Sequence, residues 1–189
     1  MYPFFRLFCT ILRARKRSKL ANNEPSQIEF YCHPWDLDLF NEMNNGRIAT
    51  LYDLGRMDLG VRTGLLAALT RYRWSLVVAG SSIRYRKRIH AFDKITMHSR
   101  FLGFDERWMY IEQSMWVKGS PCSSILIRGG ITDPNGLVTP DKIKVAFPEN
   151  HVPEQLPTWV HEWIDSEQHR PWPPSQAELA DNQASPNHI

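Results

Sequence analysis

The feature that most restricts the fold is a helical pattern followed by four long extended runs with no further long helix between them. Apolar residues recur at a helical period from Ile48 to Leu59, and from Leu76 onward the pattern changes to alternation. Clusters of Gly, Pro, Asp and Asn separate the extended part into runs of hairpin length. These runs are residues 76–89, 91–104, 106–118 and 121–132. Because helices and strands do not alternate as in βαβ units, the pattern predicts an α+β domain with a central helix and an antiparallel meander.

The segment from His33 to Arg56 joins a short predicted strand to this helix through a turn rich in carboxylates and amides. Residues 27–32 predict the strand, which His33-Pro34 ends because proline cannot donate to a ladder. Asp36 and Asp38 follow in the turn. A carboxylate just ahead of a helix can attack or deprotonate a bound group, while the free helix amides stabilise a negatively charged oxygen. The segment is therefore predicted to be an active-site turn.

Small residues and caps give further expectations for the helix, which Asn44-Asn45-Gly46 opens. Gly55 would let it approach a neighbouring backbone closely. Gly60 is predicted to end it, and Thr63 is predicted to cap a second, short helix that contains Leu65 and Leu69.

Charge divides the 189 residues into three blocks. Residues 1–23 carry six Lys and Arg and no acid, residues 24–148 carry sixteen bases and thirteen acids, and residues 149–189 carry one base and seven acids. We take these blocks as the predicted organisation: an amphipathic, basic N-terminal segment, a central domain, and an acidic tail rich in proline and tryptophan. Within the tail, Thr158–Gln168 is predicted to form one or two helical turns.

Two interpretations of residues 1–20 stay open. The apolar run is about a dozen residues, shorter than the roughly 20 that a spanning helix needs, and it lacks the order of a signal peptide. The segment is either an interfacial helix with basic residues at lipid head groups, or a helix packed on the domain or on a partner subunit. The first interpretation places these side chains in lipid: Phe4, Phe5, Leu7, Phe8, Ile11 and Leu12.

The cysteines and histidines predict neither a disulfide framework nor a metal site. Cys9, Cys32 and Cys122 are odd in number and stand at no ligand spacing, and the seven histidines are scattered. An odd count of unpaired thiols suits a reducing compartment, so a cytoplasmic location is predicted, with membrane association under the interfacial interpretation.

Four motifs, taken in order, resemble those of a known family. They are Asp36-Leu37-Asp38 with Met43-Asn44-Asn45; Asp53-Leu54-Gly55-Arg56; Ile83 to Ile89 before Asp93-Lys94-Ile95; and Ser123 to Gly136. Over about residues 27–145, their order and spacing are similar to those of the hotdog-fold acyl-CoA thioesterases, in the 4-hydroxybenzoyl-CoA thioesterase-like group.

The resemblance implies a hotdog fold, with a central helix wrapped by a curved antiparallel sheet. It also implies a homodimer or dimer of dimers with active sites between subunits, an acyl-CoA substrate, and no metal or organic cofactor. Asp38 would be the catalytic carboxylate, as nucleophile or general base, and the Asn45 amide would polarise the thioester carbonyl. Asp36 is expected to be structural, exposed or turn-capping, and Asp53 is expected to pair with Arg56.

Three arginines are candidates for binding the phosphates of coenzyme A. On a strand, Arg84, Arg86 and Arg88 would share one face, and guanidinium groups can bind phosphate through two hydrogen bonds. A solvated sheet face is the alternative. No RNA-binding motif accompanies them and the tail is acidic, so no nucleic-acid partner is predicted.

The predicted function is hydrolysis of a fatty or aromatic acyl-CoA to the free acid and CoA. The chain departs from the family at Asn41-Glu42, where Gly-His is common, and Asp38 could simply accept backbone hydrogen bonds in a tight turn. A non-catalytic acyl-binding or membrane-associated hotdog scaffold is therefore the alternative.

Overall fold

The structure is a computed structural model that describes residues 2–21, 24–146 and 155–171. The chain divides into two compact units, Met1–Gln155 and Leu156–Ile189. In the second unit, Thr158–Gln168 forms the helix α5, so a helix lies where one was predicted. All other described helices and strands belong to the first unit.

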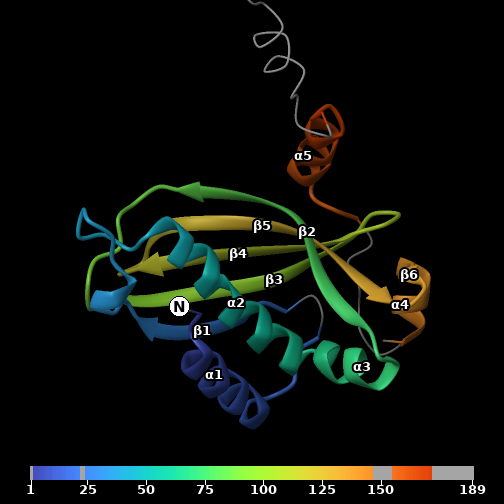
Figure 1. The fold of residues 1–189 in the computed structure, drawn as a ribbon, viewed down its shortest axis with the longest axis horizontal. Helices are drawn as coiled ribbons and strands as arrows, with labels where there is room; N and C mark the ends of the chain where they lie inside the picture. Colours follow the sequence, from blue (N-terminus) through green and yellow to red (C-terminus); the bar gives the residue numbers. More distant parts are fainter. Residues whose placement is uncertain (1, 22–23, 147–154, 172–189) are drawn as a thin grey trace, which may run out of the picture. The chain divides into compact units, whose positions relative to one another are not determined.

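The first unit is built around the helix α2 (Asn45–Arg62), which lies along the inner face of a curved antiparallel sheet (Figure 1). The strand order is β1-β3-β4-β5-β2, with β6 pairing with β5. The strands are β1 (Ser26–Tyr31), β2 (Ser75–Tyr85), β3 (Lys94–Phe104), β4 (Met109–Val117), β5 (Ser120–Asp133) and β6 (Gly136–Leu137). The α+β class and the hotdog arrangement expected from the resemblance are confirmed.

The pairing of β2 corrects the predicted four-strand meander. Of the four predicted runs, β3, β4 and β5 follow one another as hairpins, whereas β2 pairs with β5 and forms one edge of the sheet. The turns within the meander are short, but residues 86–93 form a longer connection from β2 to β3. Alternation along a strand says which side chains face inward and does not say which strand lies next to it.

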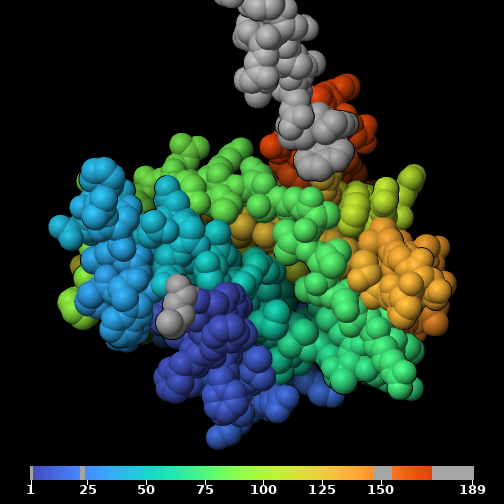
Figure 2. Space-filling view, viewed as in Figure 1, coloured from blue at the N-terminus to red at the C-terminus, as the bar shows by residue number. Residues whose placement is uncertain are grey.

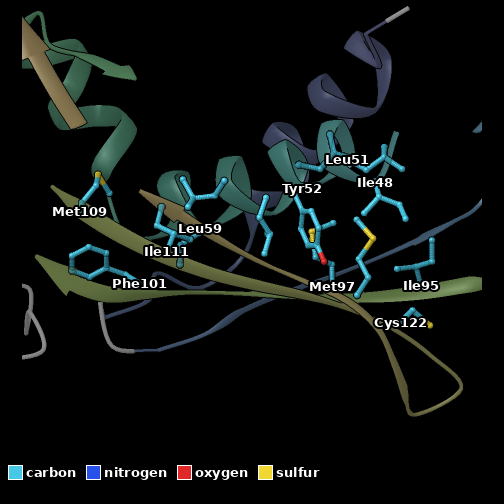
Figure 3. Packing of buried hydrophobic residues seen from close by; sticks show 14 of the residues in the cluster. Ile48, Leu51, Tyr52, Leu59, Ile95, Met97, Phe101, Met109, Ile111 and Cys122 are labelled. Atoms are coloured by element: carbon cyan, nitrogen blue, oxygen red, sulfur yellow. The ribbon is translucent and has the colours of Figure 1, made fainter. Parts of the chain in front are cut away.

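The core lies between α2 and the inner face of the sheet. On β3, Ile95 and Met97 are fully buried, and the intervening residues are more exposed, as expected for a sheet with one face on the core. Figure 3 shows Tyr52 of α2 extending toward this face. The Tyr52 hydroxyl lies 2.8 Å from Ser123 Oγ, which satisfies the polar end of the buried ring.

Gly55 allows α2 to lie directly against the sheet. A Cβ atom at this position would lie 2.5 Å from Met97 Sδ and 2.7 Å from Gln113 Nε2. Gln113 is itself fixed, because its Nε2 donates to the Tyr52 carbonyl at 2.9 Å and to Ser99 Oγ at 2.8 Å. The structure therefore shows a close approach at Gly55, but to side chains of β3 and β4 and not to a neighbouring backbone as predicted.

We expect Gly55→Ala to lower the free energy of unfolding by about 1–3 kcal/mol, the usual effect of adding a methyl group to a filled core. Gly60→Ala is the matched control, because a Cβ at Gly60 would meet only the flexible Leu66 side chain at 3.2 Å. It should be neutral or stabilising, since alanine is the better helix former. Urea unfolding of both variants measures the difference, and equal free energies would contradict the close-contact explanation.

The C-terminal end of α2 differs from its prediction. The helix continues past Gly60 to Arg62, and Thr63 Oγ1 donates back to the Leu59 carbonyl at 2.8 Å instead of capping the next helix. Gly64, at φ +81°, makes the turn into α3 (Leu65–Tyr72), because glycine adopts the left-handed region without a steric penalty.

Two further helices complete the unit. The helix α4 (Pro140–Ala146) follows β6 and was not predicted. The helix α1 (Phe4–Lys16) packs beside α2, and its Ala14 is 2% exposed (Figure 1). None of the helices in the described ranges is long and apolar enough to cross a membrane.

Candidate active site

The turn ahead of α2 begins with the short helix η1 (Pro34–Asp36), which Asp36 fixes in place. Asp36 is only 1% exposed, and its Oδ2 accepts the His33 amide at 3.0 Å. The same carboxylate pairs with Arg6 at 2.7 Å and with Arg47 at 3.2 Å. Asp36 therefore caps the turn, as predicted, and it also connects η1, α1 and α2.

Asp38 lies in the small hairpin that follows. Leu37 and Met43 pair across the hairpin, and the Asp38 amide donates to the Glu42 carbonyl at 2.8 Å. The Asp38 Oδ1 accepts the Phe40 amide at 2.8 Å. Within the described residues Oδ2 has no protein partner, and the side chain is half-buried. One carboxylate oxygen thus holds the turn and the other is available.

The start of α2 lies directly behind this hairpin. Asn44 is the N-cap residue: its Oδ1 accepts the Arg47 amide at 3.1 Å, and its own amide donates to the Asp36 carbonyl at 2.9 Å. In the part of the chain that the structure describes, the amide of Asn45 has no acceptor on the protein. An exposed amide at a helix start carries partial positive charge and can donate to a ligand oxygen.

Two contacts that were not predicted join the turn to the end of β2. Glu42 and Arg88 form an ion pair at 2.7 Å, and the Tyr85 hydroxyl donates to the Asn45 carbonyl at 3.4 Å. The sequence pattern could not predict either contact, because both depend on the path that residues 86–93 take from β2 to β3. Glu42 is one of the two residues that differ from the family motif. Its negative charge is compensated by Arg88.

The three predicted phosphate ligands do not share one strand face. The strand β2 ends at Tyr85, so only Arg84 lies in it, and Arg88 reaches the turn. Arg84 and Arg86 line a groove of about 460 Å³ whose other walls include Arg100 and Trp116. The structure thus brings Arg88 to the turn and places Arg84 and Arg86 in a separate groove.

The turn itself carries exposed apolar side chains. Leu39 is 97% exposed and Phe40 is 79% exposed. A hollow of about 490 Å³ opens at the start of α2, with Trp35, Asn44 and Gly46 among its lining residues. Neither Asp38 nor Asn45 lines this hollow, although Leu37, Asn44 and Gly46, their neighbours in sequence, do.

The remaining candidate groups are structural. Asp53 pairs with Arg56, as predicted, and also accepts the Tyr2 hydroxyl at 3.1 Å. Burial raises the pKa of the Cys32 thiol to about 11, with the Asp36 and Asp93 charges adding to the effect, and burial likewise raises the pKa of Cys122. Neither buried thiol is thus activated as a nucleophile. In the described ranges no three His, Cys, Asp or Glu side chains are grouped to hold a metal ion.

The sequence matches one family model and several individual proteins. The family model of the thioesterase-like superfamily matches residues 32–177. Protein THEM6 of Xenopus laevis is 31% identical over 135 residues, which cover 67% of this chain and 63% of that protein. Protein THEM6 of Drosophila melanogaster is 26% identical over 165 residues, covering 86% of this chain and 82% of that protein. The chain spans 63% of the length of the Xenopus laevis protein and of its Danio rerio counterpart.

Solved structures share the fold. The probable thioesterase YbaW from Escherichia coli matches with a TM-score of 0.60 at 18% identity, over 64% of this chain and 94% of that chain. The DHNA-CoA thioesterase from Staphylococcus aureus matches with a TM-score of 0.58 at 14% identity, over 87% and 98%. At these identities the likeness establishes the architecture alone.

Proposed function

The chain belongs to the thioesterase-like superfamily and has its hotdog fold, and from this premise we propose that it hydrolyses an acyl-CoA thioester to the free acid and CoA. The observation that supports the proposal is the arrangement of two polar groups, a carboxylate and a helix amide, at the turn. A carboxylate with one unpartnered oxygen, on Asp38, precedes a helix whose first amide, on Asn45, has no acceptor among the described residues.

These two groups supply the two needs of thioester hydrolysis. The Asn45 amide would donate to the carbonyl oxygen as it becomes an oxyanion, and the loss of one such donor typically costs about 10²–10³ in turnover. Asp38 would take a proton from the attacking water, or would attack the carbonyl carbon itself and form an anhydride that water then cleaves. In both routes the C–S bond breaks, CoA leaves as the thiolate and takes up a proton, and the acyl group leaves as the acid.

The surroundings of the turn suit an amphiphilic substrate. Leu39, Phe40 and Trp35 are exposed apolar side chains that a fatty or aromatic acyl group would cover. Arg88 lies beside the turn, and Arg84 and Arg86 lie further along the same segment, where guanidinium groups could bind the phosphates of CoA.

We further propose that the active unit is a homodimer joined at β2. This strand is an edge of the sheet, and Val77 and Val78 on it are 39% and 56% exposed. A long edge with unpaired backbone groups is a template for a second strand. The Tyr85 hydroxyl at the end of β2 contacts the Asn45 carbonyl. A partner subunit that pairs with β2 would therefore lie close to the turn and could cover one side of a bound substrate.

Release of free thiol from a panel of acyl-CoAs tests the function. The panel should contain short, long-chain and aromatic acyl groups, and the same acyl groups on pantetheine, which lacks the nucleotide phosphates. We expect turnover of at least one acyl-CoA, with a higher KM for the pantetheine ester because the arginine contacts are missing. Binding of acyl-CoAs without thiol release from any of them would overturn the proposal and support an acyl-binding scaffold instead.

A further inference from the structure

The helix α1 is fastened to the domain through polar residues that enter buried positions. Besides the Arg6–Asp36 ion pair, Arg17 Nη1 lies 3.3 Å from Asp58 Oδ1 and donates to the Gln27 carbonyl at 2.7 Å. Asp58 is 1% exposed and also accepts the Ser26 hydroxyl at 2.5 Å. These contacts at both ends of α1 define which side of the helix faces the domain.

The side of α1 that faces away from the domain is apolar. Phe4, Phe5, Phe8 and Leu12 are 70%, 79%, 60% and 41% exposed. Their spacing of one, three and four residues places them on one helix face. Figure 2 shows α1, in dark blue, at the molecular surface. An amphipathic helix of a globular unit normally turns this face inward, so its outward direction here indicates an external partner.

The same outward face ends in cations. Arg15 and Lys16 lie in the last turn of α1, both are exposed, and neither has an acidic partner among the described residues. Residues 1–23 contain six Lys and Arg and no acid. An apolar stripe that ends in unpaired cations is complementary to an anionic lipid surface, where rings enter the acyl boundary and cations remain at the phosphates.

We propose that α1 is a fixed membrane-docking face, which binds the surface of anionic lipid bilayers through Phe4, Phe5, Phe8 and Leu12 and through the cations of its last turn. A second copy fits this face less well, because α1–α1 packing would bring two acid-free, basic segments together. The assignment also refines the interfacial interpretation of the sequence, since Leu7 packs against the protein core instead of entering lipid.

Docking through α1 would hold the candidate active-site turn on the side of α1 that faces away from the lipid, because Arg6 on that side binds Asp36. Tyr2, two residues before Phe4, lines the hollow at the start of α2, and Arg6 binds the turn through Asp36. The docking proposal does not depend on the proposed hydrolase activity, and its test reads lipid binding alone.

The test is co-sedimentation of the full chain with phosphatidylcholine vesicles, with and without phosphatidylglycerol. We expect binding to the anionic vesicles that weakens as ionic strength rises. Phe5→Ser with Phe8→Ser should lower the partition coefficient at least about tenfold. Arg15→Glu with Lys16→Glu should lower it by about fivefold or more for each cation lost. These point substitutions leave Arg6 and Arg17 in place, whereas deletion of residues 1–17 would remove one cationic partner each from Asp36 and Asp58.

Val145→Ser is the matched control, because Val145 is 79% exposed on α4, which Figure 1 shows at a different part of the first unit from α1. It should bind vesicles as the unmodified chain does. Two results would overturn the proposal: no binding of the unmodified chain to anionic vesicles, or equal binding by the Phe5/Phe8 variant. A change of molar mass in light scattering on Phe5/Phe8 substitution, without vesicle binding, would also overturn it and assign the face to self-association.

Discussion

Replacing Asp38 by asparagine is expected to lower kcat/KM for acyl-CoA hydrolysis by about 10³-fold while changing the free energy of unfolding by less than about 0.5 kcal/mol. Asparagine keeps the size of the side chain and an oxygen that can accept the Phe40 amide, so the hairpin should stay closed. It can neither take a proton from water nor attack a thioester. The loss should therefore fall on kcat, because the groups that bind substrate are unchanged.

The β5–β6 turn supplies a matched control for this substitution. Asp133 Oδ1 accepts the Asn135 amide at 2.7 Å, which is the same local hydrogen bond that Asp38 makes to Phe40. Asp133→Asn should leave kcat/KM unchanged. If Asp38→Asn retained activity within about tenfold of the unmodified chain, Asp38 would be a turn-forming residue only, and the carboxylate chemistry would have to be sought elsewhere.

The helices and strands could largely be predicted, whereas the order of the strands could not. Periodicity and turn residues locate β1 to β5 and α2, because those signals act between neighbours in sequence. The pairing of β2 with β5 depends on how residues 86–93 cross the sheet, and no local signal reports it. The same crossing ends β2 at Tyr85 and separates Arg88 from Arg84 and Arg86.

Family spacing predicted different roles for the two aspartates of the turn, but it did not predict the surroundings of either side chain. Sequence alone could not show that Asp36 is buried, because its partner Arg6 lies thirty residues away and Arg47 lies across the hairpin. The sequence also could not predict which side of α1 faces the domain. Apolar residues surround most of that helix, so its outward face is set by which of its cations reach buried carboxylates, a tertiary property.

Replacing Asp36 by alanine is expected to lower the free energy of unfolding by about 3 kcal/mol, a large share of the 5–15 kcal/mol of a typical domain. The substitution leaves Arg6 and Arg47, whose side chains are 16% and 18% exposed, without their shared carboxylate. It also removes the acceptor of the His33 amide. The remaining exposure lets both guanidinium groups reach some water, so the loss should lie at the low end of that for a broken buried ion pair. Urea unfolding measures it.

We expect the loss of unfolding free energy in Asp36→Ala to result from the burial of the carboxylate and not simply from the removal of a negative charge. Two further variants separate these causes. Asp141→Ala removes an exposed carboxylate, 95% accessible and 3.9 Å from Lys144, and should change the free energy of unfolding by less than about 1 kcal/mol. Asp36→Asn keeps an acceptor for the His33 amide and should fall between the two. Because Asp36 fastens α1, trypsin should also cleave after Arg13, Arg15 and Lys16 faster in Asp36→Ala. Cleavage at the unmodified rate would mean that α1 is held mainly by Arg17 and Asp58, and the Arg6 pair would then contribute to the turn alone.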